Sequence, residues 1–318
     1  MKQILNKIVQ QVVKAQRFLV CSHESPDGDA IGSTLGLTLG LQRLGKEVVA
    51  YNVDGVPEIL KFLPGSQSLV TELRADAAFD VIFVLDAGDL SRAACRPAEQ
   101  GTMLINLDHH PGSNFGHLCY LDTSAAATAV LVYRLLCACG LKLDLEVATA
   151  LYTGLLSDTG SFRYANSNPE AFRVAAELVG LGINTWTIAS ALYESQPRER
   201  MQLLAQVLPT LYVAPSGQYA SVFMTLDMLE KAGAAPEHTD GFVNYPRAIS
   251  GVEVAVFFRQ VDASTIKVGF RSRGNIDVGQ LSKNLGGGGH KNAAGAFVEG
   301  SLDQVAPRVY HLLEALLK

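Results

Sequence analysis

The sequence of 318 residues has few of the features that mark secreted or membrane-spanning proteins. Its five cysteines are an odd number and include no C-x-x-C pair, which argues against a disulfide framework and against a zinc knuckle. The longest apolar stretch, 125–133, ends at Arg134 and is well short of the roughly 20 residues that span a membrane. The N-terminal segment spaces lysines among aliphatic residues and lacks the apolar run of a signal peptide. We therefore expect a cytoplasmic protein with reduced thiols and no membrane contact.

Charged residues are also few, at 18%, and the formal net charge is −5. Long nucleic acids are held by broad basic faces through counterion release, so this balance argues against a long, non-specific nucleic-acid track. Short anionic substrates remain compatible with it. The hydrophobic content of 48% indicates a globular chain with a large buried core.

The length favours two domains, and the residue pattern changes between the two halves. Four short apolar runs predict buried parallel strands, at 17–21, 48–53, 80–85 and 103–107. Helical patterns alternate with them and follow them, one at 124–139, which is typical of a doubly wound α/β domain. We expect this domain at 1–188, linker helices at 189–208, and a smaller α+β domain at 209–318. The active site is expected in the cleft between the two domains.

Acidic and histidine side chains follow three of the predicted strands, and one further aspartate ends a predicted helix. They are His23, Asp27 and Asp29; then Asp86 and Asp89; then Asp108, His109 and His110; and finally Asp158. Taken singly, each could be a turn residue, a helix cap or an ordinary hydrogen-bonded histidine. Open α/β sheets bind ligands at the carboxyl ends of their strands, so four such clusters favour one shared site. Aspartate and histidine without cysteine suit manganese or magnesium, and histidine shifts the preference toward manganese.

These motifs resemble those of the DHH phosphoesterase family. The segment HESPDGDAIGS is similar to the family's first motif, Asp86 to its second, the run Asp108-His109-His110 to its name-giving third, and Asp158 to its fourth. Near the C-terminus, GFRSRGNID and GGGGHKNAAGAF resemble the glycine-rich DHH-associated domain. The resemblance covers nearly the whole chain. Within the family, the pairing is similar to the branch of oligoribonucleases that also dephosphorylate 3′-phosphoadenosine 5′-phosphate (pAp).

The resemblance implies a centre of two divalent ions, manganese in preference to magnesium, with Asp86 bridging them. The other implied ligands are His23 and Asp27 for one ion, and Asp29, His109 and Asp158 for the second. His110 is implied to contact the scissile phosphate, and Asp108 to orient a histidine. Two such ions activate water and neutralise charge in an in-line displacement, so no covalent nucleophile is needed.

The segment 263–296 is locally basic, with five basic residues against one acid, and contains four consecutive glycines before His290. Glycine backbone can approach an anion closely and bind it through N–H groups, although a flexible surface loop is the alternative. We expect this segment to hold the distal phosphate or the terminal nucleotide, chiefly through Arg271 and His290. Further candidate contacts are Arg273, Gly287, Gly288, Gly289 and, in the first domain, Arg163.

The expected function is metal-dependent hydrolysis of phosphate esters in oligonucleotides of about two to five residues and in nucleotides such as pAp. One alternative is a phosphodiesterase of linear or cyclic dinucleotides. Pyrophosphate hydrolysis fits less well, because the family's pyrophosphatases have a different C-terminal domain. A long-strand exonuclease needs additional domains. A non-catalytic nucleotide sensor on the same scaffold predicts missing ligands, and none is missing. Homodimer formation stays open.

Overall fold

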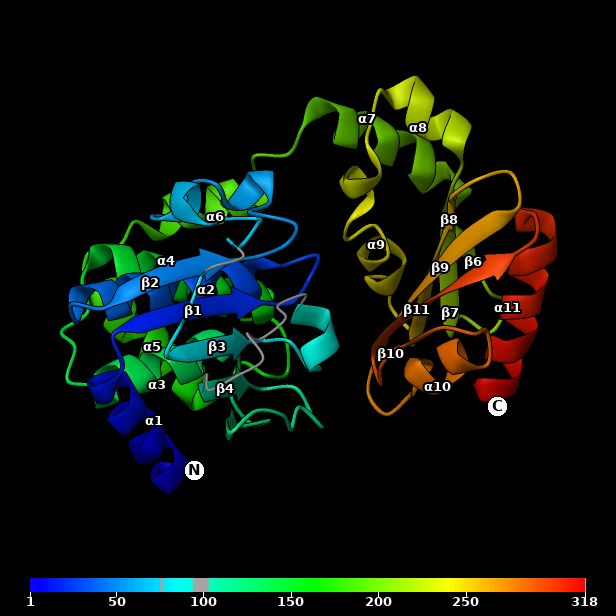
Figure 1. The fold of residues 1–318 in the computed structure, drawn as a ribbon. Coiled ribbons are helices and arrows are strands. Elements are labelled where there is room, and N and C mark those ends of the chain that lie inside the picture. Colours follow the sequence, from blue (N-terminus) through cyan, green and yellow to red (C-terminus); the bar gives the residue numbers. More distant parts are fainter. Residues whose placement is uncertain (75–76, 94–102, 318) are drawn as a thin grey trace. The chain divides into compact units, whose positions relative to one another are not determined.

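The computed structural model describes residues 1–74, 77–93 and 103–317 (Figure 1). The chain divides into two compact units, 1–195 and 196–318. Helix α6 (Thr185–Tyr193) belongs to the first unit and α7 (Arg198–Val207) to the second. The domain boundaries at 188 and 209 stay a prediction.

The first unit is built on a five-stranded parallel sheet in the order β2-β1-β3-β4-β5. Its strands are β1 (Arg17–Ser22), β2 (Glu47–Tyr51), β3 (Val81–Leu85), β4 (Met103–Asp108) and β5 (Leu118–Leu121). All five residues of β3 are buried, as expected for a strand covered on both faces. The chain passes from β1 outward to β2 on one side, and from β3 through β4 to β5 on the other. Such a switch point between neighbouring strands is where doubly wound sheets bind ligands.

Helices pack on one face of this sheet and form the larger core with it (Figure 1). They are α1 (Lys2–Lys14), α2 (Gly28–Arg43), α3 (Thr128–Ala138), α4 (Leu145–Asp158), α5 (Pro169–Gly180) and α6. A smaller core on the other face joins strand residues to side chains of connecting segments such as Phe79 and Phe115. Short 3-10 turns occur in these connections, at η1 (Glu58–Leu60), η2 (Ser66–Ser68) and η3 (Leu90–Ala93).

Helices α2 and α4 pack closely because α2 has a glycine at every fourth position, on one helical face. The glycines are Gly28, Gly32, Gly36 and Gly40. A Cβ atom at Gly32 would lie 2.6 Å from the carbonyl oxygen of Ala150. This close approach brings the first turn of α2, which carries Asp29, beside the end of α4 at Asp158.

The four strands predicted for the first unit are present, but the predicted start of α3 is wrong. The helix begins at Thr128 and not at Ser124. Asp122 Oδ1 accepts hydrogen bonds from the backbone N–H and the hydroxyl of Ser124, which hold 122–125 in a turn. Strand β5 was not predicted, because four residues of mixed burial give a weak pattern.

The second unit is a six-stranded mixed sheet in the order β10-β11-β9-β8-β7-β6, in which only β7 and β8 pair in parallel among the described strands. The strands are β6 (Tyr212–Val213), β7 (Tyr219–Met224), β8 (Val254–Gln260), β9 (Thr265–Ser272), β10 (Gly288–His290) and β11 (Ala293–Glu299). The glycine run therefore ends in a strand, and a smaller α+β unit is confirmed.

Helices cover both faces of this second sheet. Helices α10 (Val278–Lys283) and α11 (Leu302–Leu316) pack on one face. On the other face, α7 and α8 (Leu226–Ala232) pack against β7 and β8, together with residues just before α9 (Asn244–Arg247). Two 3-10 turns, η4 (Leu208–Thr210) and η5 (Pro236–Thr239), complete the unit. Within the described residues, no helix is both long enough and apolar enough to cross a membrane.

Candidate metal centre

Asp86 lies at the centre of the acidic cluster, directly after β3. Its backbone is in the left-handed region, with φ of 58°. This conformation costs a side-chain-bearing residue about 1 to 2 kcal/mol, although aspartate tolerates it better than most. The Asp86 N–H still donates to the carbonyl of Leu107 at 3.1 Å, so the residue stays attached to β4 while its carboxylate turns into the site. Strain of this kind is typical of functional positions.

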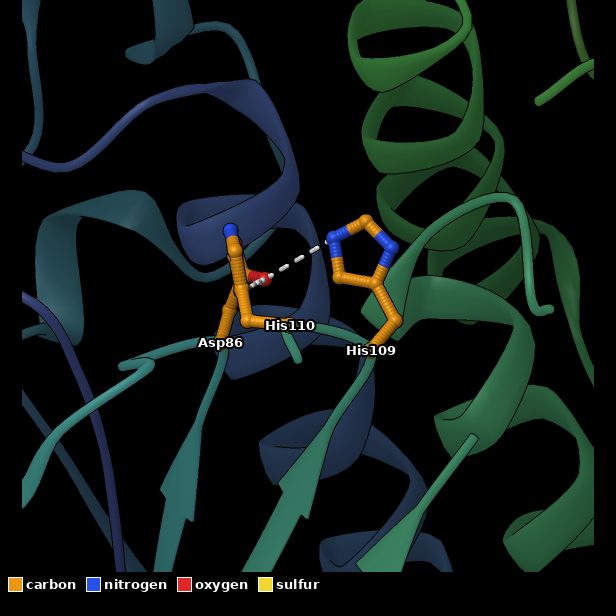
Figure 2. Close-up of side chains that lie close together, drawn as sticks. All are labelled: Asp86, His109 and His110. Atoms are coloured by element: carbon orange, nitrogen blue, oxygen red, sulfur yellow. Dashed lines mark ion pairs between the residues drawn. The ribbon is translucent and has the colours of Figure 1, made fainter. Parts of the chain in front are cut away.

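Three imidazoles face the buried carboxylate of Asp86. Its Oδ2 lies 3.8 Å from His23 Nε2, and its Oδ1 lies 3.5 Å from both His109 Nε2 and His110 Nδ1. Figure 2 shows the ring of His109 pointing toward Asp86 from the loop after β4. The Thr128 hydroxyl donates to Asp86 Oδ1 at 2.9 Å and limits its rotation. Carboxylate and imidazole atoms therefore converge where β1, β3 and β4 end.

The potential ligand atoms form three overlapping groups, and within each group they lie within 4.8 Å of one another. The groups are His23, Asp27 and Asp86; Asp29, His109 and Asp158; and Asp86, His109 and His110. His109 connects the second group to Asp86, since its Nε2 is also 3.7 Å from Asp158 Oδ2. The structure thus brings together all six predicted metal ligands.

Asp29 has a second role that the sequence did not indicate. Its Oδ2 accepts the Thr128 N–H at 2.6 Å, and its Oδ1 accepts the Ala129 N–H at 3.0 Å. These are the first two residues of α3, whose own N-cap, Ala127, cannot offer a side-chain acceptor. Asp29 therefore caps α3 from α2, and the helix in turn fixes the orientation of the carboxylate.

Asp27 and Asp158 are also fixed by neighbouring groups. Asp27 is the N-cap of α2, with Oδ1 accepting the N–H groups of Asp29 and Ala30, both at 3.0 Å. Asn166 donates from Nδ2 to Asp158 Oδ2 at 3.2 Å and to its carbonyl at 3.1 Å. Sequence reasoning missed Asn166, because an asparagine eight residues after Asp158 carries no specific signal.

Asp108 supports the site through hydrogen bonds with its neighbours. It is buried, and its carboxylate accepts the Nδ1–H of His110 at 2.8 Å, the hydroxyl of Ser113 at 2.7 Å and the Gly88 N–H at 2.7 Å. Burial alone would raise the pKa of Asp108, but the hydrogen bonds from His110 and Ser113 lower it to about 2. An ionised Asp108 requires the proton of His110 on Nδ1, which directs the Nε2 nitrogen toward other partners.

The negative charges of Asp29, Asp86 and Asp158 are poorly compensated by neighbouring positive charge. Burial, followed by repulsion from Asp29 and Asp27, raises the pKa of Asp86 well above its usual value. The same causes raise the pKa of Asp158 to about 8, and burial also raises the pKa of Asp29, against the attraction of His109. Buried acids in such a group are short of positive charge, which a divalent cation supplies. A shell of carboxylate and imidazole suits manganese or magnesium, so the residues fit a metal.

The predicted phosphate contacts lie apart from this centre in the sequence. In the first unit, Arg163 is exposed and donates from Nε to the carbonyl of Gly160 at 2.6 Å. In the second, Arg273 donates from Nη2 to the carbonyl of Arg247 at 2.7 Å. Asp89, by contrast, accepts hydrogen bonds from Ser91, as a turn residue does.

Arg271 and the glycine segment meet in the second sheet. Arg271 on β9 pairs in register with Ala293 on β11, and Ala293 pairs with His290 on β10. The side chain of His290 lies outside the described part of the structure. Gly287 and Gly289 are required by packing, because a Cβ there would lie 2.2 Å from the Gly295 carbonyl oxygen and 2.5 Å from Ala294 Cα, respectively.

Comparison with known proteins assigns a known domain to each of the two units. The DHH family N-terminal domain matches residues 17–155, and the DHHA1 domain matches 216–318. The chain is 40% identical over 308 residues to the bifunctional oligoribonuclease and PAP phosphatase NrnA of Thermus thermophilus, with 95% of this chain and 91% of that protein covered. The chain belongs to the DHH family. DHH enzymes are metal-dependent phosphoesterases, so the chain is a phosphoesterase, and its acidic and histidine side chains are positioned to bind metal.

Two further relatives agree with this assignment. The bifunctional oligoribonuclease and PAP phosphatase NrnA of Bacillus subtilis is 30% identical over 317 residues, and the match covers 98% of both chains. The crystal structure of an exopolyphosphatase-related protein from Bacteroides fragilis superposes with a TM-score of 0.93 at 30% identity, covering 99% of this chain and 96% of that one. The structural similarity therefore extends over both units of the chain.

Proposed function

We propose that this DHH protein uses two divalent ions, preferably manganese, to hydrolyse phosphate esters in short oligonucleotides and in pAp. The observation that carries the proposal is the overlap of the ligand groups at Asp86 and His109. His23, Asp27 and Asp86 would hold one ion, and Asp29, Asp86, His109 and Asp158 the other. The full-length similarity to two proteins named oligoribonuclease and PAP phosphatase supports the choice of substrates.

When bound, the ions would supply an activated water nucleophile and neutralise charge on the phosphoryl oxygens. The protein's own groups fix the geometry around them. Thr128 holds the Asp86 carboxylate, and Asn166 holds that of Asp158. Asp108 holds His110 with the proton on Nδ1, and His110 contacts the scissile phosphate through Nε2. Because these groups are held before substrate binds, little reorganisation is required in the transition state.

In the second unit, Arg271 and His290 hold the phosphate beyond the scissile one. Their register across β9, β11 and β10 supports this assignment. Arg273 and the backbone of Gly287, Gly288 and Gly289 contribute further N–H donors, and Arg163 of the first unit adds a charge. A guanidinium binds phosphate through two parallel hydrogen bonds, which fixes orientation as well as affinity.

The test is hydrolysis with manganese or magnesium across a panel of substrates. The panel contains pAp, di- to pentanucleotides, an oligonucleotide of about 24 residues, linear and cyclic dinucleotides, and pyrophosphate. We expect fast turnover of pAp and of the short oligonucleotides, highest with manganese, and poor turnover of the long strand. Equal rates on the long strand and a dinucleotide, or full activity after exhaustive chelation, would contradict the proposal. Cytoplasmic location and homodimer formation stay predictions, checked by cell fractionation and sedimentation.

A further inference from the structure

Three glycines lie side by side across the second sheet. Gly269 on β9 pairs in register with Gly295 on β11, which pairs in turn with Gly288 on β10. Glycine weakens a strand, since it loses more conformational entropy than other residues and packs no side chain. A row of three across neighbouring strands therefore needs a reason.

The fold itself supplies no steric reason at two of these positions. A Cβ at Gly269 would approach only the Phe257 carbonyl oxygen among the described atoms, at 3.9 Å, and one at Gly288 would meet no described atom within 4 Å. Neither residue has the positive φ that glycine alone adopts readily. The three glycines are half-buried. A strand glycine without such a cause often marks a place where a ligand approaches the backbone.

This glycine row lies on the face of the sheet opposite α10 and α11. Side chains alternate along β9, so that Val268 and Phe270 join the core under α11, while Lys267, Gly269 and Arg271 share the other face. Helices α7 and α8 cover that face over β7 and β8. Over β9 and β11 it carries the exposed ring of Phe297, which pairs in register with Lys267.

Phe297 is a large apolar side chain with 63% of its surface exposed. The Lys267 ammonium lies 5.4 Å from the ring centroid, a cation–π contact that restricts the motion of the ring. Arg271 and Lys267 lie on β9 on either side of Gly269, four residues or about 14 Å apart, so the glycine row passes between them. The stretch of β9 between them is long enough for one nucleoside.

Charged side chains distinguish the Lys267 end of this surface from the Arg271 end. At the Lys267 end, Glu299 shares the face of Phe297 on β11, and Asp240 lies close enough to act on the pKa of Lys267. Desolvation and repulsion from Arg259 lower that pKa, while Asp240 opposes them. Positive and negative charges therefore nearly balance at this end, and the ring is its main binding feature. The Arg271 end is the one that suits a phosphate.

We propose that Gly269, Gly295, Gly288 and Phe297 form a stacking subsite for the nucleoside that follows the phosphate held at Arg271. The inference rests on the proposed function and deepens it. The base lies over the glycine backbone and stacks against Phe297. The subsite is filled by oligonucleotides and stays empty with pAp, which ends at that phosphate, so it contributes to length preference.

The test compares trinucleotide and pAp hydrolysis in matched variants. Phe297→Ala and Phe297→Leu should lower kcat/KM for a trinucleotide roughly tenfold, because an aromatic platform is lost, and leave pAp turnover unchanged. Phe297→Trp should restore the trinucleotide rate. Gly269→Ala, which the fold accommodates, should also impair the trinucleotide alone. Trp186→Ala is the control, since Trp186 is an equally exposed aromatic, at 64%, in the first unit.

Binding of the trinucleotide to chelated full-length protein, measured by calorimetry, gives a readout independent of activity. We expect the variants to rank in the same order by trinucleotide affinity as by kcat/KM for the trinucleotide. The subsite would be overturned if the Phe297 and Gly269 variants lowered kcat/KM equally for pAp and the trinucleotide, or for neither substrate. So would a wild-type dimer that Phe297→Ala converts to monomer in sedimentation, because the face would then be an interface between copies. If wild type hydrolyses neither substrate, the proposed function is wrong, and the binding measurement still decides the subsite.

Discussion

Asp108 Oδ1 accepts two hydrogen bonds from His110, one from the backbone N–H at 2.9 Å and one from Nδ1 at 2.8 Å. Asparagine has one acceptor oxygen and one donor nitrogen in place of the two acceptor oxygens of aspartate. Asp108→Asn therefore no longer fixes the tautomer of the His110 imidazole. We expect a 10- to 100-fold loss of kcat, the usual cost of removing a group that orients a histidine, with metal content unchanged.

The pH–rate profile provides the decisive readout for Asp108→Asn, because a changed tautomer alters the protonation behaviour of the enzyme and not only its amplitude. Ser113→Ala is the matched control, since it removes a hydrogen bond to Asp108 Oδ2 and leaves both contacts with His110. A loss for Ser113→Ala as large as that for Asp108→Asn would show that Asp108 acts on the fold of the loop and not through His110.

The second prediction concerns Asp86. Asp86→Ala should abolish turnover, but alanine at φ of 58° adds backbone strain, so Asp86→Asn is the cleaner variant. Asparagine tolerates the left-handed conformation and is nearly isosteric, yet it is a far weaker metal ligand. We expect turnover to fall below detection and bound metal, measured by mass spectrometry, to decrease. Wild-type rates in a folded, metal-loaded variant would contradict the bridging role.

The third prediction follows from the raised pKa values of the metal-free centre. Asp29, Asp86 and Asp158 hold protons more tightly in the folded chain than in the unfolded one, where aspartate titrates near 3.9. Their contribution to stability is therefore fully present at low pH and is lost as pH rises, for Asp158 up to about 8. We expect the Tm of chelated protein to fall between about pH 5 and pH 8.

Manganese should reverse this trend, because its ligands must be deprotonated and its binding stabilises the folded state. The increase in Tm on adding metal should thus grow from pH 5 to pH 8, measured by differential scanning calorimetry. The chelated Asp86→Asn variant should show a weaker pH dependence than chelated wild type. A chelated wild type that gains stability over the same range would contradict the charge-deficient centre.

The fourth prediction tests how packing assembles the site. Gly32→Ala places a Cβ 2.6 Å from the Ala150 carbonyl oxygen, so α2 and α4 must separate. Overpacking costs about 1 to 3 kcal/mol, partly offset by the higher helix propensity of alanine, and we expect a net loss of about 1 to 2 kcal/mol in urea unfolding. Metal affinity should also decrease, because Asp29 and Asp158 move apart.

Gly180→Ala is the matched control for Gly32→Ala. Gly180 ends α5, and a Cβ there would meet no described atom within 4 Å. This variant should be neutral or slightly more stable and should bind metal normally. Equal behaviour of the two variants would mean that the glycine face of α2 does not determine the spacing of the acids.

The sequence was informative where local pattern and chemistry coincide. Continuous apolar runs predicted four of the strands, and the acids directly after them predicted that these side chains lie close together, because parallel strands end at one edge of a sheet. Contacts between distant segments could not be predicted. The cap of α3 by Asp29 joins residues about 100 positions apart, and Asn166 reaches Asp158 across a turn.

The glycine segment illustrates the same limit. Four glycines in sequence are compatible with a loop, and only the pairing with β11 shows that Gly288 and Gly289 lie in a strand. Strand β10 has no side-chain alternation from which to predict it, since two of its three residues lack side chains. The register that brings Arg271 level with His290 depends on the whole sheet.

The last prediction separates the roles of the two units. Arg271→Ala and His290→Ala should lower kcat/KM for pAp and dinucleotides roughly tenfold to a hundredfold, since a charge-assisted hydrogen bond to phosphate contributes about 1.5 to 3 kcal/mol. Metal content should not change. Bis-p-nitrophenyl phosphate has no second phosphate, so its hydrolysis should be nearly unaffected.

Arg308→Ala, on the exposed side of α11, removes the same charge from the covered face of the sheet and serves as the control. If Arg271→Ala and His290→Ala lower kcat/KM equally for bis-p-nitrophenyl phosphate and for the nucleotides, both side chains act at the scissile phosphate. If neither variant affects any substrate while Arg308→Ala is also silent, the basic glycine-rich segment has no part in recognition. A selective loss for pAp and dinucleotides assigns the metals to the first unit and phosphate recognition to the second.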